Sequence, residues 1–183
     1  NENLKPEENI SLEAGLKVLQ QNFMLRSSGF IRWGTNIIDW VKMNEDDTWK
    51  TMNLTSLNTK GLSIQSKVDL EKMFPQKIFQ SADINYSFAH QEKETEAHIS
   101  KYALDYLKHK VNLKLKTQLL KNFRFNTSIT WQDRAGGFIF YEDGSYGKEK
   151  EYKPFWLVDL RLMYKMDNWR IYADASNIMD KIY

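Results

Sequence analysis

Residues Val111–Trp131, VNLKLKTQLLKNFRFNTSITW, decide the fold of this chain. Apolar and polar residues alternate through both halves of the stretch, and a period of two residues is typical of a β-strand whose two faces meet different surroundings. The alternation is interrupted at Leu120-Lys121-Asn122, which is short enough for a tight turn. The stretch therefore predicts two antiparallel strands joined by a hairpin turn.

The same alternation recurs along the chain and predicts eight strands in all. The other six segments are 10–18, 22–42, 61–70, 81–88, 156–164 and 169–177. In segment 22–42 the pattern is broken around Ser27-Ser28-Gly29, where we expect a bulge or a bend. Segment 98–109 has two interpretations, an amphipathic helix or an extended approach to the fifth strand, and we prefer the extended one. The predicted fold class is all-β, an antiparallel up-and-down meander.

Short and long connections alternate between these strands. The short ones are 20–22, 72–76, 120–122 and 166–168, and the long ones are 43–49, 90–100 and 134–152. Outer-membrane β-barrels have tight periplasmic turns and long extracellular loops, so we expect the short turns on the periplasmic side. The first strand then enters from the loop side and the eighth ends there. A complete barrel normally begins and ends on the periplasmic side, so we expect a piece of a larger barrel with strands missing at both ends.

The composition fits strands that face lipid on one side and water on the other. Aromatic residues make up 14% of the 183 residues, yet the mean hydropathy is −0.62. There is no run of about 18 apolar residues, which excludes a transmembrane helix, but barrel strands need only roughly 9–11 residues of alternating polarity. The net charge of +2 gives no argument for nucleic acid. The absence of cysteine excludes a disulfide scaffold and a cysteine zinc site.

Several segments resemble the distal barrel of TonB-dependent outer-membrane receptors. They are Leu4-Lys5-Pro6-Glu7 followed by Glu13-Ala14-Gly15-Leu16, Asn36-Ile37-Ile38-Asp39-Trp40-Val41, Trp49 to Asn53 followed by Gly61-Leu62, Leu157-Val158-Asp159-Leu160-Arg161, and Ala175 to Tyr183. Ser63 and Met179 stand where Glu and Phe are usual in the family. The resemblance covers nearly the whole chain, and it rests on the order and spacing of these segments.

This resemblance implies that residues 1–183 are the C-terminal portion of a 22-stranded barrel in the outer membrane of a Gram-negative bacterium, without the plug domain, the TonB box and the final strand. Such receptors import a scarce ligand, which is an iron chelate such as a siderophore, cobalamin or a glycan. The expected partners are the TonB complex, which delivers energy through the plug, the ligand, and outer-membrane lipid. No cofactor and no enzymatic activity are expected. Segment 36–41 resembles cobalamin-type receptors.

The long connection from Arg134 to Tyr152 is the best candidate for ligand contact. Gly136 and Gly137 permit unusual backbone angles, and aromatic side chains can stack on a ring or a sugar. The candidate ligand-binding residues are Arg134, Phe138, Phe140, Tyr141 and Tyr146. The alternative is a loop that merely packs on its neighbours.

No catalytic constellation and no metal site are predicted. His90, His98 and His109 are spread over one loop and the next strand, which favours surface or lumen histidines. Glu45-Asp46-Asp47 lacks the one-three-five spacing and the glycine of a calcium loop, which favours a solvated acidic loop.

The charged strand residues and the tryptophans each have two interpretations. In a large barrel the charges line a wet lumen and the tryptophans near strand ends form an interfacial girdle, whereas in a soluble protein the charges face solvent and the tryptophans form a core. These residues are Lys67, Asp69, Lys114, Lys116, Arg124, Asp159, Arg161, Arg170 and Asp174, and Trp33, Trp40, Trp49, Trp131, Trp156 and Trp169. The alternative functions are a soluble eight-stranded lipocalin-like ligand-binding barrel and a complete small barrel that serves as an adhesin.

Overall fold

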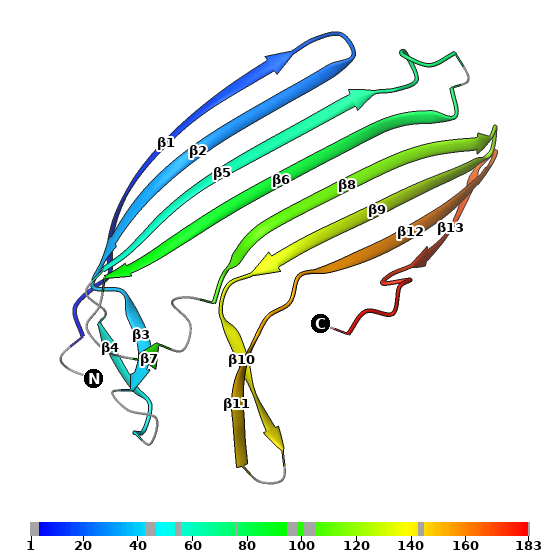
Figure 1. Cartoon of the computed structure of the whole chain (residues 1–183). Coiled ribbons are helices and arrows are strands. Elements are labelled where there is room, and N and C mark those ends of the chain that lie inside the picture. The colour runs from blue at the N-terminus through cyan, green and yellow to red at the C-terminus, as the bar shows by residue number, and fades with distance from the viewer. Residues whose placement is uncertain are drawn as a thin grey trace.

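The computed structural model describes residues 4–42, 47–53, 56–75, 77–94, 99–100, 105–142 and 145–182. Eight long strands form one antiparallel sheet in the order β1-β2-β5-β6-β8-β9-β12-β13 (Figure 1). Their bounds are β1 Glu8–Leu19, β2 Phe23–Thr35, β5 Ser56–Asp69, β6 Phe79–Glu94, β8 Leu107–Leu120, β9 Phe123–Arg134, β12 Phe155–Met166 and β13 Trp169–Ala175. The predicted eight-stranded antiparallel meander is confirmed. The described residues contain no helix long and apolar enough to span a membrane.

Two small sheets lie together at one end of the long strands (Figure 1). One has the order β4-β3-β7, from Lys50–Asn53, Ile38–Lys42 and Ile99–Ser100, and the other pairs β10, Gly137–Glu142, with β11, Ser145–Glu151. The short turns lie at the opposite end. The predicted alternation of short and long connections is therefore confirmed, and the long connections carry the small sheets.

The predicted second strand, 22–42, is wrong in two respects. It ends at Thr35, because Asn36 has a φ of 54°, and residues 38–42 belong to the small sheet. The expected bulge at 27–29 is absent, since β2 pairs without a register shift with both neighbours. The polarity pattern is lost there because Ser27 and Gly29 occupy positions that are apolar elsewhere, while the hydrogen-bond ladder continues. Within the eight-stranded sheet, the register shifts of the described strands all lie near strand ends.

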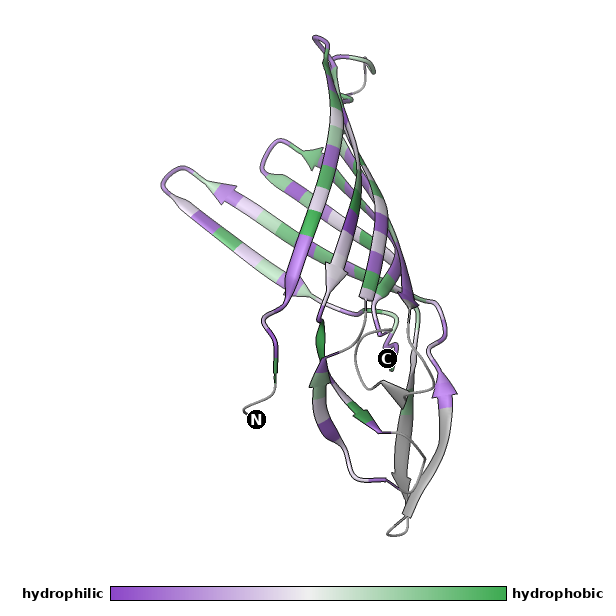
Figure 2. Cartoon of the chain, turned by 90° about the vertical axis from the view of Figure 1, so that its left-hand side faces the viewer, coloured by the Kyte–Doolittle hydropathy of each residue, from purple (hydrophilic) through white to green (hydrophobic). Residues whose placement is uncertain are grey.

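The two faces of the main sheet differ in chemistry, and polarity alternates along each long strand (Figure 2). The face that carries Gln65, Asn85 and Asn112, which pair side by side across three strands, is here called the inner face. The opposite, outer face carries Ile64 and Tyr86, which also pair with each other. Between the two ends of the strands, no described residue of the outer face is charged.

No layer formed by described residues covers the outer face. Ile10, Leu16 and Trp156 are 74%, 67% and 53% exposed, and Val41 of the small sheet is the only buried hydrophobic residue in the described part of the chain. An apolar surface of this extent marks an interaction site or contact with lipid. A lipocalin-like barrel would close on itself around this face, whereas the sheet is open with β1 and β13 as its edges, so that alternative is wrong.

Aromatic residues gather at two levels of the outer face. Near the loop end, the ring of His109 lies 4.9 Å from that of Phe88, and Trp131 lies 6.4 Å from Trp156. Near the turn end, Phe123 lies 4.5 Å from Tyr164. The stretch from Phe123 to Trp131 is about 26 Å long, or roughly 20 Å high at a strand tilt of about 40°, which approaches the band of roughly 25 Å expected for an outer-membrane barrel.

The predicted tryptophan girdle needs one correction. Trp33, Trp131, Trp156 and Trp169 lie near the ends of long strands, as predicted. Trp40 lies in β3 and Trp49 immediately precedes β4, so neither lies in a long strand.

Candidate functional site

Most polar residues of the long strands gather on the inner face. The inner-face position of a residue follows from its register with Gln65, Asn85 and Asn112. The basic residues there are Lys17, Arg26, Arg32, Lys67, Lys93, Lys110, Lys114, Lys116, Arg124, Arg134, Arg161, Lys165 and Arg170. The acidic ones are Glu13, Asp69, Asp83, Asp159 and Asp174. Every charged strand residue predicted to face a lumen is among them, and the basic ones predominate.

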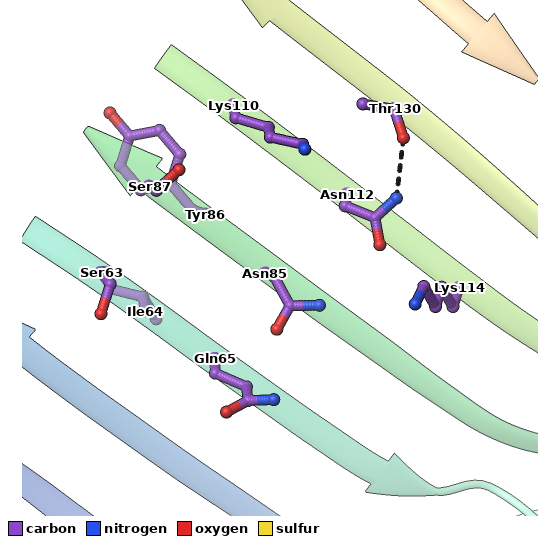
Figure 3. A pocket seen from close by; sticks show the side chains of 10 residues that line it. All are labelled: Ser63, Ile64, Gln65, Asn85, Tyr86, Ser87, Lys110, Asn112, Lys114 and Thr130. Carbon is purple, nitrogen blue, oxygen red and sulfur yellow. Dashed lines mark hydrogen bonds between the residues drawn. The ribbon is translucent and has the colours of Figure 1, made fainter. Parts of the chain in front are cut away.

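The centre of the inner face is hollowed over β5, β6, β8 and β9 (Figure 3). The hollow has a volume of about 520 Å³. It is lined by Ser63, Ile64, Gln65, Asn85, Tyr86, Ser87, Lys110, Asn112, Lys114 and Thr130. Amide, hydroxyl and ammonium groups therefore dominate it, and no acidic residue lines it.

The hydrogen bonds of the hollow leave much of its polar surface available. The Asn112 amide donates to Thr130 Oγ1 at 2.8 Å and to Ser128 Oγ at 3.2 Å. Lys110 and Lys114 lie on either side of Asn112 along β8 (Figure 3). Neither lysine is in an ion pair with a described residue. The hollow thus offers two unpaired cations beside amide and hydroxyl groups.

The predicted ligand loop is a hairpin, and two of its five candidate residues lie at the root. Arg134 Nη2 donates to Asp105 Oδ1 at 2.7 Å, and its guanidinium lies 5.1 Å from the ring of Tyr152. The ring of Tyr152 lies 5.4 Å from that of Phe138, and its hydroxyl donates to Asp105 Oδ2 at 3.4 Å. These four residues, here called the root cluster, join the hairpin to the start of β8.

The other three candidates lie further along the hairpin. Phe140 and Tyr141 belong to β10, and Tyr141 pairs with Tyr146 of β11. Their side chains lie outside the described part, so their contact with a ligand stays a prediction. Gly136 has a φ of 90°, which confirms its predicted unusual backbone.

The segments that resemble the family meet at the loop-side rim. Glu7 Oε1 accepts a hydrogen bond from the Ile38 amide at 2.7 Å. The Asn53 amide donates to the carbonyls of Lys5 and Asn36 at 2.9 and 2.5 Å, while its oxygen accepts from the Lys5 amide at 2.8 Å. These five residues, here called the rim clasp, fasten the small sheet to the start of β1. The residues of these family-like segments thus hold the backbone of the loop-side rim in place.

A buried acid lies in the same small sheet. Asp39 is only 5% exposed, and its Oδ1 accepts from the Trp40 amide at 2.7 Å. Burial lowers the pKa of the Lys93 ammonium, and the negative charge of Asp39 opposes that shift. Both residues lie beyond the aromatic level of the outer face, towards the loops.

The two histidines in the described part of the chain, His90 and His109, have different partners. His90 and Lys60, on the outer face near the loop end, each lie 3.0 Å from Glu92 Oε1. The Lys60 hydrogen bond and charge, helped by His90, hold the pKa of the Glu92 carboxyl below its ordinary value. His109 Nδ1 lies 3.0 Å from the Tyr86 hydroxyl. His98 lies outside the described residues, as do Glu45 and Asp46 of the acidic loop.

The end of the chain forms a turn built on Asn177. Its φ is 49°, its side-chain oxygen accepts from the Lys181 amide, and its amide group donates to the Lys181 carbonyl, each at 3.0 Å. The Asn177 backbone amide donates to Asp159 Oδ1 at 2.8 Å. The family-like segments 157–161 and 175–183 are therefore joined directly.

The hollow was missed as a site because no single strand reveals it. Gln65, Asn85 and Asn112 are recognisable as polar-face residues, but only the register places them side by side. A usable signal was the cluster of amide residues at polar positions of three successive strands. Asp105 of the root cluster carried no such signal.

The sequence profile of the family described as TonB dependent receptor-like, beta-barrel, matches residues 1–178. The chain belongs to this family. Comparison with curated proteins gave no match. The fold class and the predicted resemblance are confirmed, and the family and its structural neighbours are transport receptors.

Solved structures share this fold at low sequence identity. The ferric enterobactin receptor PfeA of Pseudomonas aeruginosa, as a mutant in complex with enterobactin, has a TM-score of 0.73 at 16% identity over 99% of this chain and 27% of that chain. The copper transporter OprC has a TM-score of 0.71 at 14% identity over 98% of this chain and 26% of that chain. The siderophore receptor PirA of Acinetobacter baumannii has 0.70 at 15% over 99% and 29%. The chain thus spans little more than a quarter of these structures.

Proposed function

We propose that this chain forms part of the wall of an outer-membrane receptor in a Gram-negative bacterium, which imports a scarce iron chelate. Energy comes from the TonB complex through a plug domain, and the wall itself catalyses no reaction. Residues 1–183 serve as a distal portion of the barrel.

The observation that carries this proposal is the division of one sheet into two chemically opposite faces. The outer face is apolar, uncovered by protein and bordered by aromatic residues at two levels. The inner face is polar and hollowed. Such a sheet is stable where lipid covers one face and water the other.

Two of the structural neighbours support an iron chelate as the ligand. PfeA binds enterobactin in its complex, and PirA is a siderophore receptor. The cobalamin alternative rested on segment 36–41, whose residues Asn36 and Ile38 take part in the rim clasp through their backbone. An iron chelate is therefore favoured over cobalamin and glycans.

An uptake assay tests this function. The full-length receptor is expressed in a Gram-negative strain that lacks its own chelate receptors, and uptake of radioactive iron is measured from ferric tricatecholates, trihydroxamates and citrate. We expect uptake of at least one chelate, and its loss in an otherwise identical strain without TonB. Uptake of cobalamin or a glycan instead, or uptake that persists without TonB, would refute the proposal.

A further inference from the structure

We infer that the hollow around Lys110 and Lys114 is a binding site for the oxygen atoms of an anionic metal chelate. This inference rests on the proposed function and narrows its ligand to a charged class. It locates the site on the barrel wall, apart from the loop hairpin that the sequence favoured.

The first support is the unequal distribution of charge between the two faces. The whole chain has a formal net charge of only +2. Basic residues predominate on the inner face, whereas the middle of the outer face carries no charge on any described residue. A hollow lined by one sign of charge concentrates the field and raises the local concentration of the opposite ion.

The second support is that much of this positive charge is not neutralised within the sheet. Arg161 is held by Asp174 through two hydrogen bonds at 2.5 and 2.9 Å, and Asp69 pairs with Lys72. By contrast, Lys67, Lys110 and Lys114 are in no ion pair with a described residue. Asp83 lies between Lys67 and Lys114 in the register, yet forms an ion pair with neither.

The third support is the chemistry around the two lysines. Gln65 and Asn85 carry amide groups that can donate to oxygen, and so can the hydroxyl of Ser87. The Ser63 hydroxyl already shares a hydrogen bond of 2.9 Å with the Ser28 hydroxyl. All four line the same hollow as Lys110 and Lys114, and no carboxylate does (Figure 3). Charged donors give hydrogen bonds to anionic oxygen that are roughly twice as strong as neutral ones. A neutral ligand would gain less from the two ammonium groups than an anionic one.

The experiment compares two ferric chelates that differ in charge. Binding of a ferric tricatecholate, which is anionic, and of a ferric trihydroxamate, which is neutral, is followed by stopped-flow tryptophan fluorescence on the full-length receptor in detergent. We expect the double variant Lys110→Gln/Lys114→Gln to bind the tricatecholate about tenfold more slowly at low salt, as for steered association. The difference should vanish near 1 M salt, where the screening length is roughly 3 Å.

The control is Lys60→Gln, which removes a positive charge from the outer face of β5, a strand that also contributes residues to the hollow. It should leave the rates for both chelates unchanged. Heat-modifiable migration in gels checks that each variant is folded. An unchanged tricatecholate rate in the double variant, or an equal loss for both chelates, would overturn the inference.

Three further outcomes distinguish a chelate from the plug as the source of the anionic oxygen, and the inference from the proposed function. If the lysines hold carboxylates of the plug instead, the double variant loses thermal stability without chelate while its tricatecholate rate is unchanged, which overturns the inference. If the wild-type receptor binds only the trihydroxamate, iron-chelate import stands and the anionic site falls. If it binds neither of these chelates nor ferric citrate, both fall.

Discussion

At the scale of single residues, small side chains mark the places where strands approach closely. A Cβ atom added to Gly61 would overlap Cε1 of Phe30 and lie 2.8 Å from the Phe88 carbonyl oxygen. The ring of Phe30 therefore occupies the space that a side chain at Gly61 would need. Gly29, on the outer face, has only ordinary contacts, the nearest at 3.7 Å.

This difference predicts unequal losses of stability for two glycine substitutions. Gly61→Ala should lower the free energy of unfolding by about 1–3 kcal/mol, because overpacking forces neighbouring atoms to shift. Gly29→Ala, the control, should change it much less. Urea unfolding of the full-length receptor in lipid measures both, and equal effects of the two substitutions would show that the contact with Phe30 is unimportant.

The Glu92 carboxyl should titrate below its ordinary pKa of 4.5, because Lys60 and His90 stabilise its charged form. A lowered pKa favours the folded state at pH values above 4.5, and this contribution disappears as the pH falls through the folded-state pKa. Carboxyl ¹³C NMR of selectively labelled receptor measures the midpoint, and Lys60→Gln should move it upwards. A wild-type midpoint at or above 4.5 would contradict the assignment.

At the scale of elements, the loop-side sheets are fastened to the long strands by a few polar side chains. The root cluster holds the β10–β11 hairpin, and the rim clasp holds β3 and β4. Both use groups far apart in sequence, such as Arg134 with Asp105. The roots of these loops are therefore fixed to the long strands by contacts between distant parts of the chain.

The rim clasp gives a prediction of local stability. Asn53→Asp keeps the oxygen acceptor but removes the donor to the Lys5 and Asn36 carbonyls, at a cost of about 1–3 kcal/mol for unsatisfied groups. Hydrogen exchange should become faster in residues 36–42 and stay unchanged in β5 and β6. Asn168→Asp, in the exposed turn between β12 and β13, is the control. Exchange that rises throughout the main sheet would show a global effect instead.

Sequence predicted the long strands better than it predicted their partners at the rim. Alternation identifies a strand such as β8 because each of its faces meets one environment. The end of β2 was missed because apolar residues continue beyond Asn36 into β3, and polarity does not report the φ of a single residue. The hollow was missed because its residues converge only through a register across several strands, and Arg134 gave no indication of its distant partner, Asp105.

At the scale of the whole molecule, the main sheet depends on its surroundings for stability. Leu115, Thr127 and Leu160 pair across three strands of the outer face, between the two aromatic levels. A fold of this kind has no core of its own, and lipid replaces the second layer of a soluble sandwich. This arrangement leaves the inner face available for water, a plug and a passing ligand.

The middle of the outer face should therefore reject charge. Leu115→Arg is expected to destabilise the full-length receptor by about 2–4 kcal/mol in lipid, the cost of arginine near the bilayer midplane. Ser81→Arg, on the inner face between Asp69 and Lys116 in the register, should cost much less. Folding titrations in liposomes measure both, and equal costs would show that the two faces meet the same medium.

The register of the main sheet is uninterrupted away from the strand ends, and this limits how strand lengths can change in evolution. Because side chains alternate with a period of two, one inserted residue in mid-strand would exchange lipid-facing and water-facing positions for the rest of that strand. Insertions in pairs would preserve the parity of every position. The register shifts of the main sheet lie near strand ends, at Phe79/Ser81, Leu107/His109 and Gln118/Leu120. Single-residue insertions and deletions are therefore expected to persist only near the strand ends. There, a change in strand length does not exchange the lipid-facing and water-facing positions of the rest of the strand.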